Sequence, residues 1–172
     1  VQCGMGRTGT IMTYFQYDIL PDILCLAKGI GAGFPMGAFV ANKKFAAAME
    51  PGDHGSTYGG NPMAGQACRT VFKILEDTKM IDHVQDISEY LIEKLDDLQE
   101  EFPCIKERRG LGLMIGLEFD KPVKDIVKTC LDLGLIVVTA GPHVVRMLPP
   151  FITTEKDVDQ AIAILKEAIE KN

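Results

Sequence analysis

The distribution of glycine divides this chain into two parts of different character. Most of its 17 glycines lie in residues 1–60, where apolar residues show no long helical repeat. From Pro62 onward apolar residues recur at helical spacing, and Asn61 stands where a helix N-cap is expected. A glycine-rich region of loops and short strands is therefore expected to precede a region dominated by helices.

Helical periodicity is strongest between Pro62 and Pro103. Two stripes of apolar side chains have the spacing of one face of an amphipathic helix. They are Met63, Ala67, Val71, Ile74 and Leu75, followed by Val84, Ile87, Leu91, Leu95 and Leu98. The spacing predicts two successive helices, each buried along its stripe.

The rest of the chain predicts a small α+β domain. Residues 105–119 have strand character, and a helix from Pro122 is expected to end with Gly134 as its C′ residue. Residues 135–138 and 144–148 are predicted to form two strands. A last helix should begin at Thr154, which an aspartate follows at the capping-box position.

Composition and charge limit the class of partner. Hydrophobic residues make up 47% of the chain and charged residues 24%, which is typical of a globular protein with a buried core. The net charge of −6 argues against nucleic acid or an anionic membrane as the main partner. No apolar stretch is long enough to span a bilayer.

The 5 cysteines are far apart in the sequence and form no C-x-x-C pair. They are interpreted as reduced, packed cysteines of a cytoplasmic protein, with Cys25 inside a buried run. The 3 histidines show no metal-ligand spacing, so no metal site is expected.

Lys28 occupies an unusual position. It follows the apolar run 23–27, which is predicted to be a strand buried on both faces, and it opens the glycine-rich turn 29–33. Burial would lower the pKa of a lysine and make its amine a nucleophile that can form a Schiff base with an aldehyde. The alternative is a solvated lysine at a strand end.

Two glycine segments could be taken for nucleotide-binding loops. Gly4–Gly9 matches G-x-G-x-x-G, but the β-branched and aromatic residues that follow do not predict the helix that a dinucleotide site requires. The turn 29–33 lacks the Gly-Lys-Ser/Thr ending of a Walker loop. A dinucleotide-binding domain read from Gly4–Gly9 is therefore the weaker alternative.

Two further features suit anions. Ser56 and Thr57 precede the helix expected from Pro62, where hydroxyl groups and backbone amides can bind a phosphate. An N-capping turn without a ligand is the alternative. Arg146 has apolar neighbours, so its guanidinium needs an anionic partner, either an internal carboxylate or that of a substrate.

Together these segments resemble one family, the class III aminotransferases, which use pyridoxal phosphate. The resemblance covers essentially the whole chain, and its segments in order are 1–9, 20–37, 56–62 and 146–150. It implies an α/β, fold-type I pyridoxal-phosphate transferase fragment. Residues 1–76 would be the C-terminal portion of the large mixed-sheet domain, and residues 77–172 the small C-terminal α+β domain.

The resemblance also implies roles for individual residues. Lys28 would form the covalent link to the cofactor and later move a proton at the substrate. Gln2 would bind the phenolic oxygen of the cofactor. Ser56 and Thr57 would bind its phosphate from the neighbouring subunit of a homodimer, and Arg146 would bind the α-carboxylate of the amino-acid substrate.

Within the family the chain most resembles the acetylornithine aminotransferases of arginine biosynthesis. That similarity implies amino transfer from N-acetylornithine to 2-oxoglutarate, with ornithine, succinylornithine or 4-aminobutyrate as alternative donors. The acidic Asp-Glu pair that precedes Val-Gln in the family would lie before Val1, so the chain is expected to be part of a longer protein. Alone, it is expected to bind cofactor weakly and turn over poorly, or to be an inactive fragment.

Overall fold

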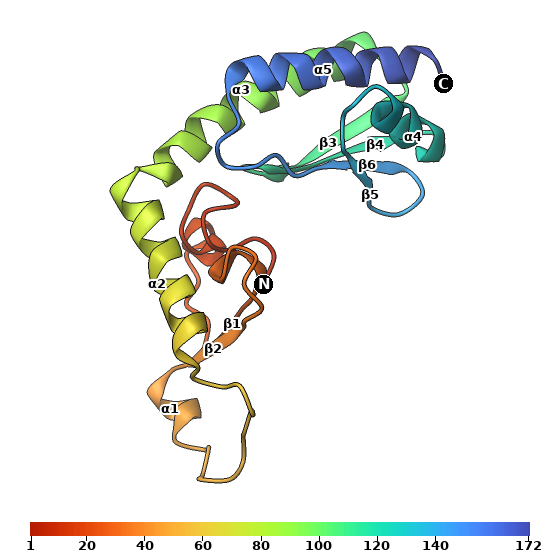
Figure 1. Ribbon diagram of the computed structural model, residues 1–172. Coiled ribbons are helices and arrows are strands. Elements are labelled where there is room, and N and C mark those ends of the chain that lie inside the picture. Colours follow the sequence, from red (N-terminus) through yellow and green to blue (C-terminus); the bar gives the residue numbers. More distant parts are fainter. The chain divides into compact units, whose positions relative to one another are not determined.

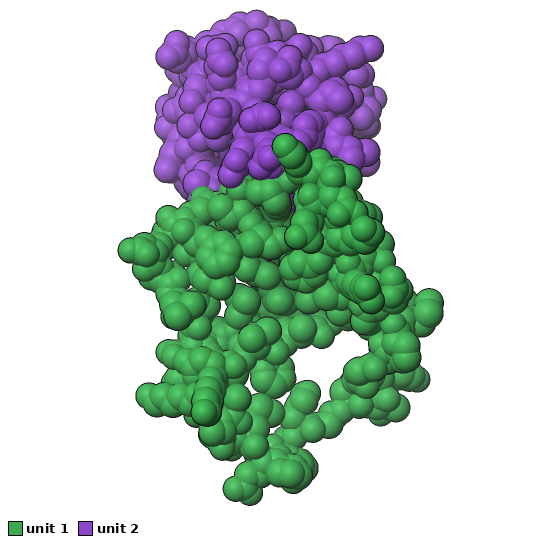
Figure 2. Space-filling view, turned by 90° about the vertical axis from the view of Figure 1, so that its left-hand side faces the viewer, with its two compact units in different colours: residues 1–81 green, residues 82–172 purple.

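The glycine-rich and helical parts of the sequence fold differently in the computed structural model, which describes residues 1–172. The chain separates into two units, residues 1–81 and 82–172 (Figure 2). The boundary lies near the beginning of α3 (Met80–Glu101). No helix is both long and apolar enough to cross a membrane.

The first unit contains one antiparallel ribbon, a long helix and several short elements (Figure 1). Strand β1 pairs with β2, so that Ile23 lies opposite Ala41 and Leu26 opposite Ala38. The elements are η1 (Thr13–Tyr17), β1 (Ile23–Leu26), η2 (Lys28–Ile30), β2 (Ala38–Ala41), α1 (Lys43–Ala46) and α2 (Pro62–Asp77).

The strand predicted at 23–27 is present, but its predicted burial on both faces is wrong. Ile23 is 53% exposed, Cys25 is exposed, and Val40 of the paired strand is 57% exposed. Burial on both faces requires layers of side chains above and below the strand. Here β1 belongs to a two-stranded ribbon whose apolar side chains remain largely accessible.

Helix α2 begins where the sequence predicted. The Asn61 side chain accepts a hydrogen bond from the Ala64 backbone N–H at 2.9 Å, and Pro62 occupies the first turn. The predicted burial of its stripe is wrong, however, because Leu75 alone is buried while Met63 is 68% exposed.

The second unit is a four-stranded antiparallel sheet with three helices (Figure 1). The strands lie in the order β3-β4-β6-β5, so β4 and β6 are the central pair. The elements are α3 (Met80–Glu101), β3 (Ile105–Leu111), β4 (Met114–Phe119), α4 (Lys124–Asp132), β5 (Val138–Thr139), β6 (Val144–Met147) and α5 (Glu155–Glu170).

Helix α4 ends as predicted, and its end explains why the strand predicted at 135–138 begins only at Val138, as β5 (Val138–Thr139). Gly134 has a φ of +94°, its N–H donates to Leu131 O at 3.0 Å, and Leu135 N–H donates to Cys130 O at 2.8 Å. This is the Schellman arrangement of a helix C-terminus. Because residue 135 completes the helix end, strand pairing begins only at Val138.

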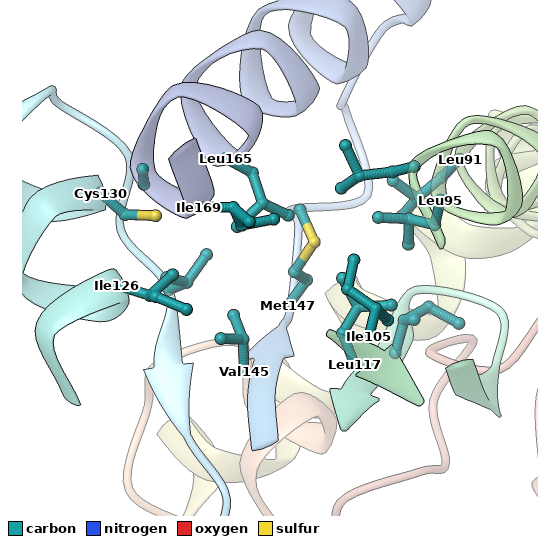
Figure 3. Packing of buried hydrophobic residues seen from close by; sticks show 14 of the residues in the cluster. Leu91, Leu95, Ile105, Leu117, Ile126, Cys130, Val145, Met147, Leu165 and Ile169 are labelled. Atoms are coloured by element: carbon teal, nitrogen blue, oxygen red, sulfur yellow. The ribbon is translucent and has the colours of Figure 1, made fainter. Parts of the chain in front are cut away.

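The hydrophobic core belongs to the second unit. Figure 3 shows side chains of α3, α4 and α5 pointing toward those of β3, β4 and β6. The stripe predicted on α3 is confirmed, since all five of its residues are buried. Along β4 burial alternates, so that Ile115, Leu117 and Phe119 face the helices while Gly116 and Glu118 lie on the outer face.

The capping box predicted for α5 is confirmed. Thr154 Oγ1 accepts from Asp157 N–H at 3.3 Å, and Asp157 accepts from Thr154 N–H at 2.9 Å. All five cysteines are free thiols. Burial raises the pKa of the Cys130 thiol to about 11, whereas Cys25 lies on the exposed ribbon.

Candidate active site

The N-terminal glycine loop is closed by its own hydrogen bonds. Met5 N–H donates to Ile11 O at 2.8 Å, Thr13 Oγ1 to Cys3 O at 2.7 Å, and Gln16 Nε2 to Thr8 O at 2.6 Å. The loop leads into the short 3₁₀ helix η1 and not into an α-helix. The α-helix that would have to open within the loop of a dinucleotide site is therefore not formed at Gly4–Gly9.

This loop lies against the segment that carries Lys28. The Val1 amine donates to Cys25 O at 3.3 Å, and a Cβ at Gly29 would lie only 3.1 Å from the Met5 Cβ. The two segments can approach this closely because Gly29 has no side chain. The hydrogen bond of Val1 thus holds the start of the chain beside β1, and Gln2, the next residue, is exposed.

Lys28 is the first residue of η2 and has a φ of +51°. A left-handed conformation costs a non-glycine residue about 1–2 kcal/mol, and such strained residues cluster at functional sites. Of the two alternatives for Lys28, a buried or a solvated side chain, the structure shows the second, because the residue is exposed. Neither the strain nor the exposure could be read from the residue type.

A hollow of about 410 Å³ lies at Lys28. Its other lining residues are Gly29, Ala32, Gly33, Phe34, Pro35 and Met36. The Lys28 ammonium forms no ion pair with a carboxylate of the chain. An accessible amine over a glycine-rich backbone fits the requirements of an aldehyde cofactor.

The Ser56 turn forms a second hollow, of about 360 Å³. Ser56 and residues 35–37 line this hollow together, and Pro35 and Met36 also line the Lys28 hollow. Gly59 N–H donates to Ser56 O at 3.1 Å, which closes the turn before α2. Thr57 is exposed and is not among the residues that line either hollow, so the structure does not bring it to Lys28.

Arg146 lies on β6 in the second unit. Its side chain is partly buried, and its Nε–H is buried without a hydrogen-bond acceptor. A buried donor without an acceptor costs about 1–3 kcal/mol. An anionic ligand is therefore favoured at Arg146, because the sequence-level alternative, an internal carboxylate on that nitrogen, is not observed.

A second arginine on the same sheet has its charge already compensated. Arg109 on β3 forms ion pairs with Glu107, at 2.7 Å, and with Glu118. These two carboxylates raise the pKa of Arg109, with Glu118 the larger contributor. Sequence reasoning missed this distinction, which requires knowing that Glu118 and Arg109 lie on adjacent strands.

Comparison with known proteins places the chain in a family. Residues 1–169 match the family model described as aminotransferase class-III. The chain is 44% identical over 170 residues to the acetylornithine aminotransferase of Clostridium acetobutylicum. The aligned residues make up 98% of this chain and 44% of that protein.

Solved structures agree with this match. Ornithine aminotransferase from Plasmodium yoelii superposes with a TM-score of 0.93 at 30% identity, over 99% of this chain and 46% of that one. N-acetylornithine aminotransferase from Stenotrophomonas maltophilia superposes with a TM-score of 0.85 at 34% identity, over 99% and 45% respectively. The chain thus spans less than half the length of these relatives. It belongs to the class III aminotransferases, a pyridoxal-phosphate-dependent family, and has the α/β fold of the corresponding part of a fold-type I enzyme.

Proposed function

We propose that this chain, as part of a longer polypeptide, transfers the δ-amino group of N-acetylornithine to 2-oxoglutarate, producing N-acetylglutamate semialdehyde and glutamate. The observation that carries the proposal is Lys28, a strained and accessible lysine over a glycine-lined hollow in a class III chain. The choice of donor rests on the 44% identity with an acetylornithine aminotransferase.

Different residues of the chain would bind different parts of the cofactor. When bound, pyridoxal phosphate supplies an aldehyde and a conjugated ring that withdraws electrons from the reacting carbon of the substrate. Lys28 would hold the aldehyde through Nζ and, once released, carry the proton to and from the substrate. Gln2 would donate to the phenolic oxygen, and Ser56 and Thr57 would bind the phosphate.

Arg146 would orient the substrate. Its guanidinium can bind an α-carboxylate with two parallel hydrogen bonds, and its unpaired Nε–H supplies one of the donors. Thr57 does not line the Lys28 hollow of its own chain. We propose that it serves the phosphate site of a neighbouring subunit in a homodimer. We further propose a cytoplasmic location, consistent with five free thiols.

Ornithine is the second candidate donor. The specific observation in its favour is the TM-score of 0.93 with an ornithine aminotransferase. Both donors carry an α-carboxylate for Arg146, so that residue does not distinguish between them.

Trapping the cofactor on its lysine tests the proposal. The 172-residue chain is mixed with pyridoxal phosphate, reduced with borohydride and mapped by peptide mass spectrometry. We expect the label on Lys28 and its loss in Lys28→Ala. Lys44→Ala, which changes another exposed lysine of the same unit, should leave the labelling of Lys28 unchanged. Labelling spread evenly over the exposed lysines would contradict the proposal.

The same assay separates the donors. Adding N-acetylornithine before the borohydride should release the cofactor from Lys28 and so reduce its labelling more than an equal concentration of ornithine does. The reverse order would assign the chain to the ornithine-specific group. The loss of either effect in Arg146→Lys would show that this guanidinium binds the donor.

A further inference from the structure

The outer face of the second unit's sheet carries a row of four residues, one from each strand. The register places Arg109 of β3 opposite Gly116 of β4, Gly116 opposite Arg146 of β6, and Arg146 opposite Val138 of β5. Directly paired residues project from the same face of a sheet. Gly116 is therefore a position without a side chain between two guanidinium groups.

The backbone at Gly116 does not require glycine. Gly110, in the same hairpin, has a φ of +129°, whereas Gly116 has the ordinary negative φ of a strand. Glycine in a strand interior costs stability and often marks a site where a ligand approaches closely. The absence of a side chain at Gly116 therefore needs a reason other than its backbone conformation.

Two neighbours define what a side chain at Gly116 would meet. Its Cβ would lie 3.1 Å from Val144 Cγ1, which is tight, and 3.9 Å from Arg109 O. Opposite residues of an antiparallel pair have Cβ atoms about 4.5–5.5 Å apart, so a longer side chain would extend alongside that of Arg146. Arg109 is held by Glu107 and Glu118, which leaves Arg146 as the guanidinium with an unmet donor.

We propose that Gly116 is a positioning residue for the substrate: its missing side chain keeps the space beside Arg146 open for a carboxylate. This inference rests on the proposed role of Arg146. It adds that binding of a carboxylate to Arg146 depends on the residue opposite it. A large apolar side chain at position 116 would block this binding, and a carboxylate side chain there would take the place of the ligand.

A carboxylate titration of the chain tests the proposal. The Nε–Hε signal of Arg146, assigned by its loss in Arg146→Lys, is followed by ¹⁵N NMR as glutarate is added, with the signal of Arg109 as an internal reference. We expect glutarate to shift the Arg146 signal, and Gly116→Val to weaken binding by about tenfold, which is ~1.4 kcal/mol. Gly116→Asp should move the signal toward its ligand-bound position without glutarate.

A second substitution separates this role from simple packing. If glycine only makes room for Val144, then Val144→Ala should restore glutarate binding in Gly116→Val. We expect it to raise the thermal midpoint of that variant while binding stays weak. Restored binding, or wild-type affinity in Gly116→Val, would overturn the proposal.

The outcome is also distinguishable from a failure of the proposed function. An Arg146 signal that does not respond to glutarate in the wild-type chain would overturn the roles of both Arg146 and Gly116. Borohydride trapping at Lys28 does not depend on either residue, so it tests the proposed role of Lys28 independently. Wild-type trapping together with unaltered binding in Gly116→Val would reject the inference about Gly116 alone.

Discussion

Gly110 lies near the end of β3, opposite Ile115 of β4; its φ is +129°, and its Cβ would lie 2.1 Å from the carbonyl oxygen of Met114. Gly134 also has a positive φ, of +94°, but a Cβ there would meet no atom within 4 Å. The two glycines therefore separate two effects of a methyl group. One site carries backbone strain alone, and the other carries backbone strain together with a steric clash.

We expect Gly134→Ala to lower the free energy of unfolding by about 1 kcal/mol, because alanine is strained at positive φ. Gly110→Ala should cost at least ~2 kcal/mol more, because the hairpin must also move to relieve the clash with Met114. Urea unfolding monitored by circular dichroism measures both values. Equal losses of stability in the two variants would mean that the hairpin adjusts to the methyl group at position 110 without a cost in free energy.

At the scale of single elements, helix α5 depends on its capping box. The Thr154 N–H and hydroxyl both donate to Asp157 Oδ2, at 2.9 and 2.7 Å. These bonds lower the pKa of the Asp157 carboxyl below its ordinary value, with the backbone bond the largest cause. A carboxyl whose pKa is lower in the folded state stabilises the fold above its unfolded pKa.

Replacing Thr154 by alanine is expected to lower the free energy of unfolding by about 1 kcal/mol. Thr154→Ser keeps the capping hydroxyl group and should therefore lower it much less. The contribution of Asp157 is present above pH 3.8, its ordinary pKa, and is lost as the pH falls through the lowered value. The difference in stability between wild type and Thr154→Ala should therefore shrink with acidification. A difference independent of pH down to full protonation would exclude this role for Asp157.

Element ends could be predicted from the sequence because they depend on neighbouring residues. Asn61, Gly134 and Thr154 each act on a backbone group within a few positions, so residue type and spacing suffice. Burial of β1 and of the α2 stripe was predicted wrongly, because burial depends on what covers a surface and not on the surface itself.

The candidate site divides in the same way. Lys28 and Arg146 could be identified from their residue types among apolar neighbours. The strained φ of Lys28 depends on tertiary contacts of its turn, and the place of Gly116 opposite Arg146 depends on strand register. A shift of register by one residue would put Ile115 at that position, so no local pattern could have identified it.

At the scale of the whole chain, buried apolar side chains are distributed unevenly. All residues of the main hydrophobic cluster lie in the second unit, whereas the buried apolar side chains of the first are Met5, Leu26, Ile30 and Leu75. Burial of apolar surface must offset the conformational entropy lost by every ordered residue. The second unit meets this requirement far better than the first.

Hydrogen exchange on the full chain is expected to reveal this difference. Amides of β4 and β6 should exchange at least about a hundredfold more slowly than those of β1 and β2, since core strands open only with global unfolding. Mass spectrometry of peptic fragments measures the rates without dividing the chain. Equal protection of the two sheets would show that the first unit is stabilised as well as the second.

The β1–β2 ribbon has a consequence for ligand affinity. Its outer edges have no neighbouring strand, and Lys28 follows directly after β1. A ligand that rigidifies the Lys28 turn must also offset the conformational entropy of the adjoining strand β1, which pairs on one side only. Any segment that adds to the edge of β1 lowers that cost in advance, and thermodynamic reciprocity requires the ligand to tighten the added segment by the same factor. Strand pairing and cofactor binding are thus two measurements of one coupling free energy.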